Sequence, residues 1–252
     1  MKRQRAQEQV AVFLSEDHRP WQMERAKQVE AFVVCTRMEA TVAVVVATPG
    51  WLASKRSVEY LFVLAQARHV DVVSFEWVLQ CDPAGPVAPL KPHLLRDATL
   101  EAAARGAATL LAGHLVVPSR QLPEASEAAA GDGEALRGSR SGLRLGALGF
   151  RDVSLLALLH GAEVADPWSL PLPVHRGFSG PHVAAVRELA PARAPGARPA
   201  CHVLVPAMDA VSKLGLDIYA SFAPGFRPVL VEWLVLTLQN QSLANSDRFA
   251  VY

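Results

Sequence analysis

The 252-residue sequence predicts an α/β fold made of two copies of one small unit, each a mostly parallel four-stranded sheet flanked by helices and packed in tandem. Two observations predict this fold. Strand-like and helix-like segments alternate, and strands joined by helical crossovers form parallel sheets. A β-branched run that leads into Glu-Trp and an aliphatic helix also occurs twice, as "VVSFEWVLQC" at 72–81 and "VLVEWLVLTL" at 229–238. Duplication of a whole β/α unit explains both observations.

The first copy has the order β-α-β-β-α-β-α. Its second β-branched run, "TVAVVVA", is apolar on both faces, which is typical of a strand covered on both sides. Pro20 suits the first turn of a helix, and "DPAGP" ends the last helix. From hydrophobic periodicity we expect strands at 9–14, 32–35, 41–47 and 69–74, and helices at 20–32 and 75–81. The segment 48–67 is expected to begin with a turn and to continue as a helix whose apolar stripe is Val58, Leu61, Phe62 and Ala65.

The second copy repeats this order more loosely, and Gly161 is expected to stop its first helix. The expected elements are strands at 142–150, 201–207 and 226–231, a short strand after Gly161, and helices at 151–165, 208–222 and 232–241. The predicted domain boundaries are 8–82 for the first repeat, 83–140 for a partly flexible linker, 141–252 for the second repeat, and about 167–200 for a Pro-rich insert within it. Within the linker, 98–117 can form a helix and a short strand.

Bulk composition limits the classes of function. The formal net charge is +1, so no global field attracts nucleic acid or a membrane, and a charged partner needs a local patch. Cys35, Cys81 and Cys201 lie far apart without metal-ligand spacing, which indicates reduced thiols and no metal site. No secretory signal or membrane span is visible, so an intracellular location is the default expectation. The N-terminal "KRQR" could contribute to a nuclear address or be a solvated terminus.

The repeated strand-Trp-helix stretch resembles the BRCT domain, and two such units in tandem resemble the C-terminal modules of DNA-damage response, checkpoint or kinetochore scaffolds. The matching residues are Trp77 and Trp233, which the resemblance places in the core as structural residues. The resemblance covers most of the chain outside the linker and insert. The Gly-Gly turn common in the family is absent from the first copy, where "VEAFVV" stands, and only Gly161 represents it in the second.

The resemblance implies a pocket in the first repeat that binds phosphoserine or phosphothreonine peptides. Ser15 would supply a hydroxyl and Glu16 a backbone N–H, and such donors beside a cation make an anion site. Glu59 stands where the family usually has a lysine, and its carboxylate would repel a phosphate by about 1–4 kcal/mol. Lys55, four residues earlier, could replace that lysine.

Several of the candidate site residues also have a purely structural interpretation. Arg56 matches a family position that contacts the peptide main chain or a carboxylate, but it could equally be a solvated helix arginine. Ser15 could be a helix cap, and Lys55 could be solvated. Leu61 and Leu148 could line a groove between the repeats or belong to the core.

Enzyme signatures are lacking. "GFSGP" at 177–181 has the wrong glycine spacing for a nucleophile elbow and lies in a Pro-rich segment. "SEDH" at 15–18 holds Ser, Asp and His, but neighbours in sequence rarely form a triad. No phosphate-binding glycine loop is present. We therefore expect neither catalysis nor a cofactor.

Three hypotheses follow. The first is a phosphopeptide-binding module of a larger nuclear protein, which recruits it to chromatin, DNA damage or kinetochores. The second is a phosphate-independent protein scaffold, which Glu59 favours. The third is DNA binding through a local cluster of cations, namely Lys2, Arg3, Arg5, Lys55 and Arg56.

Overall fold

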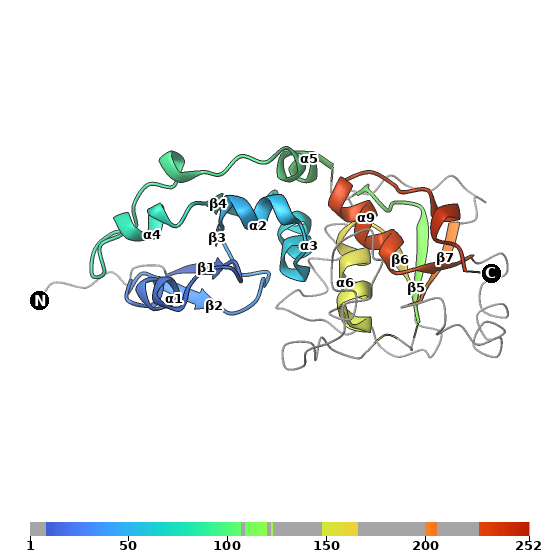
Figure 1. The fold of residues 1–252 in the computed structure, drawn as a ribbon, viewed down its shortest axis with the longest axis horizontal. Helices are drawn as coiled ribbons and strands as arrows, with labels where there is room; N and C mark the ends of the chain where they lie inside the picture. Colours follow the sequence, from blue (N-terminus) through green and yellow to red (C-terminus); the bar gives the residue numbers. More distant parts are fainter. Residues whose placement is uncertain are drawn as a thin grey trace, which may run out of the picture.

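Two parallel four-stranded sheets, each with its own helices, form the described part of the protein (Figure 1). The computed structural model describes residues 9–106, 109–119, 122, 148–165, 200–205 and 227–251. In each sheet the strand that comes first in the sequence of the unit lies second in space. The spatial orders are β2-β1-β3-β4 and β6-β5-β7-β8. The predicted fold class, an α/β tandem of two small parallel sheets flanked by helices, is confirmed.

In the first unit every strand pair is parallel, and the β1–β3 pairing aligns Leu14 with Val46. Its core strand β3 is buried along its whole length, as expected for an apolar run covered on both faces. The elements are β1 (Val10–Leu14), α1 (Pro20–Lys27), β2 (Phe32–Cys35), β3 (Val44–Val46), α2 (Pro49–Ser54), α3 (Val58–Ala65), β4 (Asp71–Val73) and α4 (Glu76–Gln80).

The segment 48–67, predicted to be a turn followed by one helix, contains two helices. Lys55 ends α2 in the left-handed conformation, with φ 53°. Ser57 then begins α3, because its hydroxyl oxygen accepts a hydrogen bond from the Glu59 backbone N–H at 3.0 Å. The predicted apolar stripe from Val58 to Ala65 coincides with α3, and α2 occupies the part of the segment that was predicted to be a turn.

The second unit starts earlier than predicted. A short helix η1 (Lys91–His93) and α5 (Ala98–Gly106) follow the first unit, and then β5 (His114–Pro118) forms the second strand of the second sheet. The range expected as linker, 83–140, therefore contains a central strand, and a boundary at 141 is too late. The remaining elements are α6 (Phe150–Leu159), β6 (Glu163–Val164), β7 (Ala200–Val205), β8 (Arg227–Leu230), α9 (Glu232–Asn240) and η5 (Ser246–Phe249).

The strand predicted at 142–150 is wrong at its end, because Phe150 already begins α6. Gly149 is the extended residue before that helix, and its N–H donates to the Asp152 carboxylate at 3.3 Å. Residues 142–147, the helix predicted at 208–222 and nearly all of the predicted insert lie outside the described residues.

The duplication is visible at the level of single bonds. In each unit the buried Trp donates its indole Nε1–H to a backbone carbonyl eleven residues later, at 2.9 Å, and the last strand forms one antiparallel bridge to the segment beyond. The hydrogen-bonded pairs are Trp77–Ala88 and Trp233–Ala244, and the bridged pairs are Val73–Leu94 and Val229–Ala250. Each of these residues in the second unit lies 156 residues after its counterpart in the first unit, as Trp233 does after Trp77.

The two units share one hydrophobic cluster. Helix α3 packs against both α6 and α9, which places the core of the tandem at this helix junction (Figure 1). Tyr60, Leu61 and Leu64 of α3 are fully buried there, together with Leu156 of α6 and Leu234 of α9. Burial of several such side chains, each stabilising by roughly 1.5–3 kcal/mol, fixes the units against each other.

Candidate functional site

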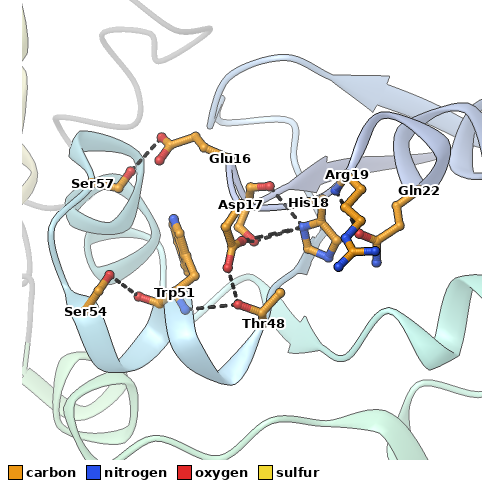
Figure 2. A network of polar contacts seen from close by, with 10 residues as sticks. Glu16, Asp17, His18, Arg19, Gln22, Thr48, Trp51, Ser54 and Ser57 are labelled. Carbon is orange, nitrogen blue, oxygen red and sulfur yellow. Dashed lines mark hydrogen bonds and ion pairs between the residues drawn. The ribbon is translucent and has the colours of Figure 1, made fainter.

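The end of β1 carries a cluster of hydroxyl and carboxylate groups (Figure 2). The Ser15 N–H donates to the Val46 carbonyl at 2.9 Å, so Ser15 lies where β1 and β3 end at the same sheet edge. Its side chain is buried. The Ser15 hydroxyl donates to Asp17 Oδ1 at 2.6 Å, and its oxygen is 3.0 Å from His18 Nδ1. Carboxyl ends of parallel strands commonly carry binding sites, and Ser15 is placed at such an edge.

Asp17 joins two hydroxyl groups. Its second carboxylate oxygen accepts a hydrogen bond from Thr48 Oγ1, and its side chain is 39% exposed. Thr48 is also the N-cap of α2, because its hydroxyl oxygen accepts from the Trp51 N–H at 3.0 Å. Two hydroxyl donors from different strand ends thus converge on one negative charge. The anion that these hydroxyls bind in the structure is the carboxylate of Asp17.

A further buried donor lies on the helix that Thr48 caps. Trp51 is 4% exposed, and its indole Nε1 is buried with no hydrogen-bond partner among the described residues. Figure 2 shows the Trp51 ring next to the Asp17 side chain, on the helix that Thr48 caps. A buried donor without an acceptor costs about 1–3 kcal/mol.

Glu16 lies at the edge of the cluster that faces the start of α3. Its exposed carboxylate accepts a hydrogen bond from the Ser57 hydroxyl at 2.6 Å (Figure 2). Since Ser57 caps α3, the loop after β1 is held to the start of α3 through Glu16. The predicted use of the Glu16 backbone N–H is compatible with this contact and stays a prediction.

The predicted cation Lys55 points to α5. Its ammonium group donates to Thr99 Oγ1 at 2.5 Å, and its backbone carbonyl accepts from Gln239 Nε2 of the second unit at 2.5 Å. The side chain of the neighbouring Arg56 is exposed. Of the two, Arg56 is the cation that is available to a ligand.

Glu59 has a structural role. It is 9% exposed, and its Oε2 accepts a hydrogen bond from the Met38 backbone N–H at 2.7 Å. Leu61 and Leu148 are fully buried in the cluster that joins the two units. Of the two alternatives for these leucines, a groove between the repeats or the core, the structure shows the core.

Sequence reasoning named Ser15 and Glu16, which the structure places in this cluster, and did not name Thr48, Trp51 or Asp17 as binding residues. A signal for Thr48 was present, since Thr-Pro is a common start of a helix. Nothing in the sequence pattern indicated that Asp17 would reach it, because the two residues lie at different strand ends.

A second polar cluster lies on the sheet of the second unit. His114 of β5 and His202 of β7 have ring nitrogens 3.1 Å apart, and the His202 ring packs on Trp233 at 4.4 Å between centroids. Burial, with His114 and Arg227 nearby, lowers the pKa of His202 to about 4. Burial also lowers the pKa of His160 to about 4. No group of three metal-ligating side chains occurs within the described ranges.

The described helices include none with the length and apolar character needed to cross a membrane. The chain matches no protein-family model and no curated protein sequence.

Several solved structures resemble the chain over nearly its whole length. The BRCT5–BRCT6 domains of Brc1 from S. pombe are 12% identical, cover 97% of both chains and have a TM-score of 0.47. Part of Rtt107p is 9% identical, covers 98% of this chain and 92% of that one, and has a TM-score of 0.47. A complex of Rtt107p with a phosphorylated histone is 7% identical, covers 96% and 92%, and has a TM-score of 0.46. The Brc1 structure is named as a pair of BRCT domains, the family that the sequence resembles. The fold of this chain is established by its own strand order and by the duplication of the unit.

Proposed function

We propose that this tandem of BRCT-like repeats is a non-enzymatic module that binds a phosphoserine or phosphothreonine peptide at the end of β1. The observation that carries the proposal is the convergence of the Ser15 and Thr48 hydroxyls on a single carboxylate. A phosphate group that displaced Asp17 would receive both hydroxyl donors. Hydrogen bonds to a charged group contribute about 1.5–3 kcal/mol each.

The resemblance to tandem BRCT modules supports a wider role. In this proposal the module belongs to a larger nuclear protein, which it recruits to chromatin, DNA damage or kinetochores. Its partner is a phosphorylated protein segment, and Arg56 provides the cation beside the phosphate.

A titration of matched phosphorylated and unphosphorylated peptide libraries against the 252-residue chain tests the proposal. We expect binding that depends on the phosphate, and a loss of about tenfold to a hundredfold in Ser15→Ala, which removes one hydrogen bond to a charged group. Ser54→Ala is the matched control, because its hydroxyl donates only to the Trp51 carbonyl of its own helix. Equal affinity for both libraries would refute phosphate recognition.

A second candidate function is a phosphate-independent protein scaffold. Asp17 already occupies the hydroxyl donors, and Glu59 stands where the family usually has a lysine. If this candidate holds, unphosphorylated partner peptides bind as tightly as phosphorylated ones, and Ser15→Ala leaves both affinities unchanged.

No observation favours DNA binding. Lys2, Arg3 and Arg5 of the proposed cationic cluster lie outside the described residues, and the Lys55 ammonium donates to Thr99.

A further inference from the structure

His18 contacts Ser15 through both its backbone and its ring. Its backbone N–H donates to the Ser15 carbonyl at 3.1 Å, which closes the turn at 15–18. Its ring Nδ1 lies 2.9 Å from the same carbonyl oxygen and 3.0 Å from the Ser15 hydroxyl oxygen (Figure 2). The side chain of His18 is 0% exposed, so the ring can influence a ligand only through Ser15.

The partners of Nδ1 determine which nitrogen of the His18 ring carries the proton. The Ser15 hydroxyl has a single proton, which it donates to the Asp17 carboxylate at 2.6 Å, because a carboxylate only accepts hydrogen bonds. Toward His18, the hydroxyl oxygen and the carbonyl oxygen of Ser15 are therefore both acceptors. Two acceptors at 3.0 Å or less assign an N–H donor to Nδ1.

This donation orients the Ser15 hydroxyl group. A serine hydroxyl rotates to suit its partners, and its oxygen can accept one hydrogen bond while its proton is donated elsewhere. Because the His18 N–H occupies one side of the oxygen, the hydroxyl proton points away from the ring and toward Asp17. A phosphate in place of that carboxylate would meet a donor that is already aimed at it, which lowers the cost of ordering the donor on binding.

The second unit makes the same pair of backbone hydrogen bonds without a histidine. Ser119 follows β5 as Ser15 follows β1, and each serine N–H donates to a carbonyl of the next strand, β7 or β3, at 2.8 and 2.9 Å. The Leu122 N–H then donates to the Ser119 carbonyl at 3.1 Å, as the His18 N–H does in the first unit. Leu122 is buried in the hydrophobic cluster. The fold therefore accepts an apolar side chain at this position, and turn closure does not require the imidazole ring.

We propose that His18 is a positioning residue of the module, whose Nδ1–H holds the Ser15 hydroxyl in the orientation that donates to a phosphate oxygen. The proposal rests on the proposed function, because Ser15 is the residue that contacts the phosphate. The second unit, which has Leu122 at the equivalent position, lacks this orienting donor.

Three substitutions separate the position of the donor from the packing of the ring. His18→Asn keeps an N–H the same number of bonds from Cβ as Nδ1, His18→Gln moves it one bond further, and His18→Leu introduces the residue type of the second unit. Affinity for a phosphoserine peptide is measured by fluorescence anisotropy with the 252-residue chain. We expect His18→Gln and His18→Leu to bind about three- to tenfold more weakly, the contribution of about one hydrogen bond, and His18→Asn to retain most of the affinity.

Urea titrations of the same variants provide the comparison with a purely structural role. Asparagine leaves the larger cavity, so a role in packing alone predicts that His18→Asn is impaired more than His18→Gln, which is the opposite order. His93→Asn is the matched control, because its ring is also buried but bonds to Gln80. We expect this control to lose stability and to keep its affinity for the phosphopeptide.

Nitrogen chemical shifts of the His18 ring, measured by NMR on the free chain, provide a test that needs no ligand, and we expect the proton on Nδ1. A neutral ring protonated at Nε2 overturns this proposal, as does phosphate-dependent binding in which His18→Gln is as tight as His18→Asn, and both results leave the proposed function standing. Equal binding of phosphorylated and unphosphorylated peptides by the unsubstituted chain overturns both.

Discussion

Replacing Asp17 by asparagine should convert the self-occupied anion site into one that is open to a phosphate. The carboxylate accepts hydrogen bonds from Ser15 and Thr48, and both donors are needed by an incoming phosphate. The asparagine would keep one side-chain oxygen as an acceptor, so the N-cap residue Thr48 retains a partner. The substitution changes the charge at the site while keeping nearly the same side-chain volume.

The size of the effect follows from the position of Asp17. Its side chain is 39% exposed, so the dielectric constant of water is the appropriate choice. Two unit charges about 4 Å apart then interact by about 1 kcal/mol. A phosphoserine carries a charge of about −1.5 to −2, which gives about 2 kcal/mol of repulsion, or roughly a thirtyfold gain in phosphopeptide affinity when the carboxylate is removed.

Isothermal titration with one phosphopeptide and its unphosphorylated counterpart measures this gain. Glu24→Gln is the control, since it removes an exposed carboxylate that pairs with Lys27 on α1. The gain should shrink as salt is raised, because exposed charges are screened. An unchanged or weaker affinity in Asp17→Asn, or an equal gain for both peptides, would refute the view that Asp17 competes with phosphate.

Three further predictions concern stability. Glu59→Ala should lower the free energy of unfolding by about 2 kcal/mol in urea titrations, because the Met38 N–H loses its acceptor; a loss under about 0.5 kcal/mol would contradict this role. Lys55→Gly should be more stable than Lys55→Ala by about 1 kcal/mol, since only glycine adopts φ 53° without strain; thermal melts in which alanine is as stable would show otherwise. His160 and His202 have pKa values of about 4 in the folded chain and about 6.5 when unfolded, so the unfolded state binds more protons and stability falls as pH drops from 6.5 toward 4. We expect about 2 kcal/mol lost per ring between about pH 7 and 5, and a pH-independent urea midpoint would argue against buried neutral rings.

The predicted outcome of one substitution changes once the structure is known. From sequence, Glu59→Lys is a test for a latent phosphate pocket, because it restores the usual family residue. In the structure Glu59 accepts from the Met38 N–H in a buried position, and a lysine there would leave that donor without its acceptor. A loss of affinity in this variant would therefore report on folding, so Asp17→Asn is the better test.

The fold was predictable because its signals are local and occur twice. The β-branched run before Trp77 and Trp233 identifies the last strand and helix of each unit, and both rings are fully buried as predicted. The strand β5 was harder to place, since its short apolar run follows an Ala-rich helix and its sheet partners come from distant segments. The break at Lys55 left no trace in the periodicity, because it depends on a single left-handed residue.

The site was predictable only in part. Ser15 follows the first strand, and that position could be found by counting. The contacts that decide its chemistry connect residues far apart in sequence, such as Asp17 with Thr48, and no spacing rule contains them. Whether a side chain such as Leu61 lines a groove or fills the core is likewise decided by the packing of two units against each other.

The constant interval of 156 residues between equivalent contacts holds from β4 onward but not at the start of the unit, since β1 and β5 are separated by a shorter interval. Each unit thus has one part whose length is fixed and one part that accommodates additional chain. In the first unit the adaptable part carries Ser15 and Asp17, while Trp77 anchors the fixed part. The candidate site and the Trp contact that recurs in both units therefore lie in separate parts of the same unit.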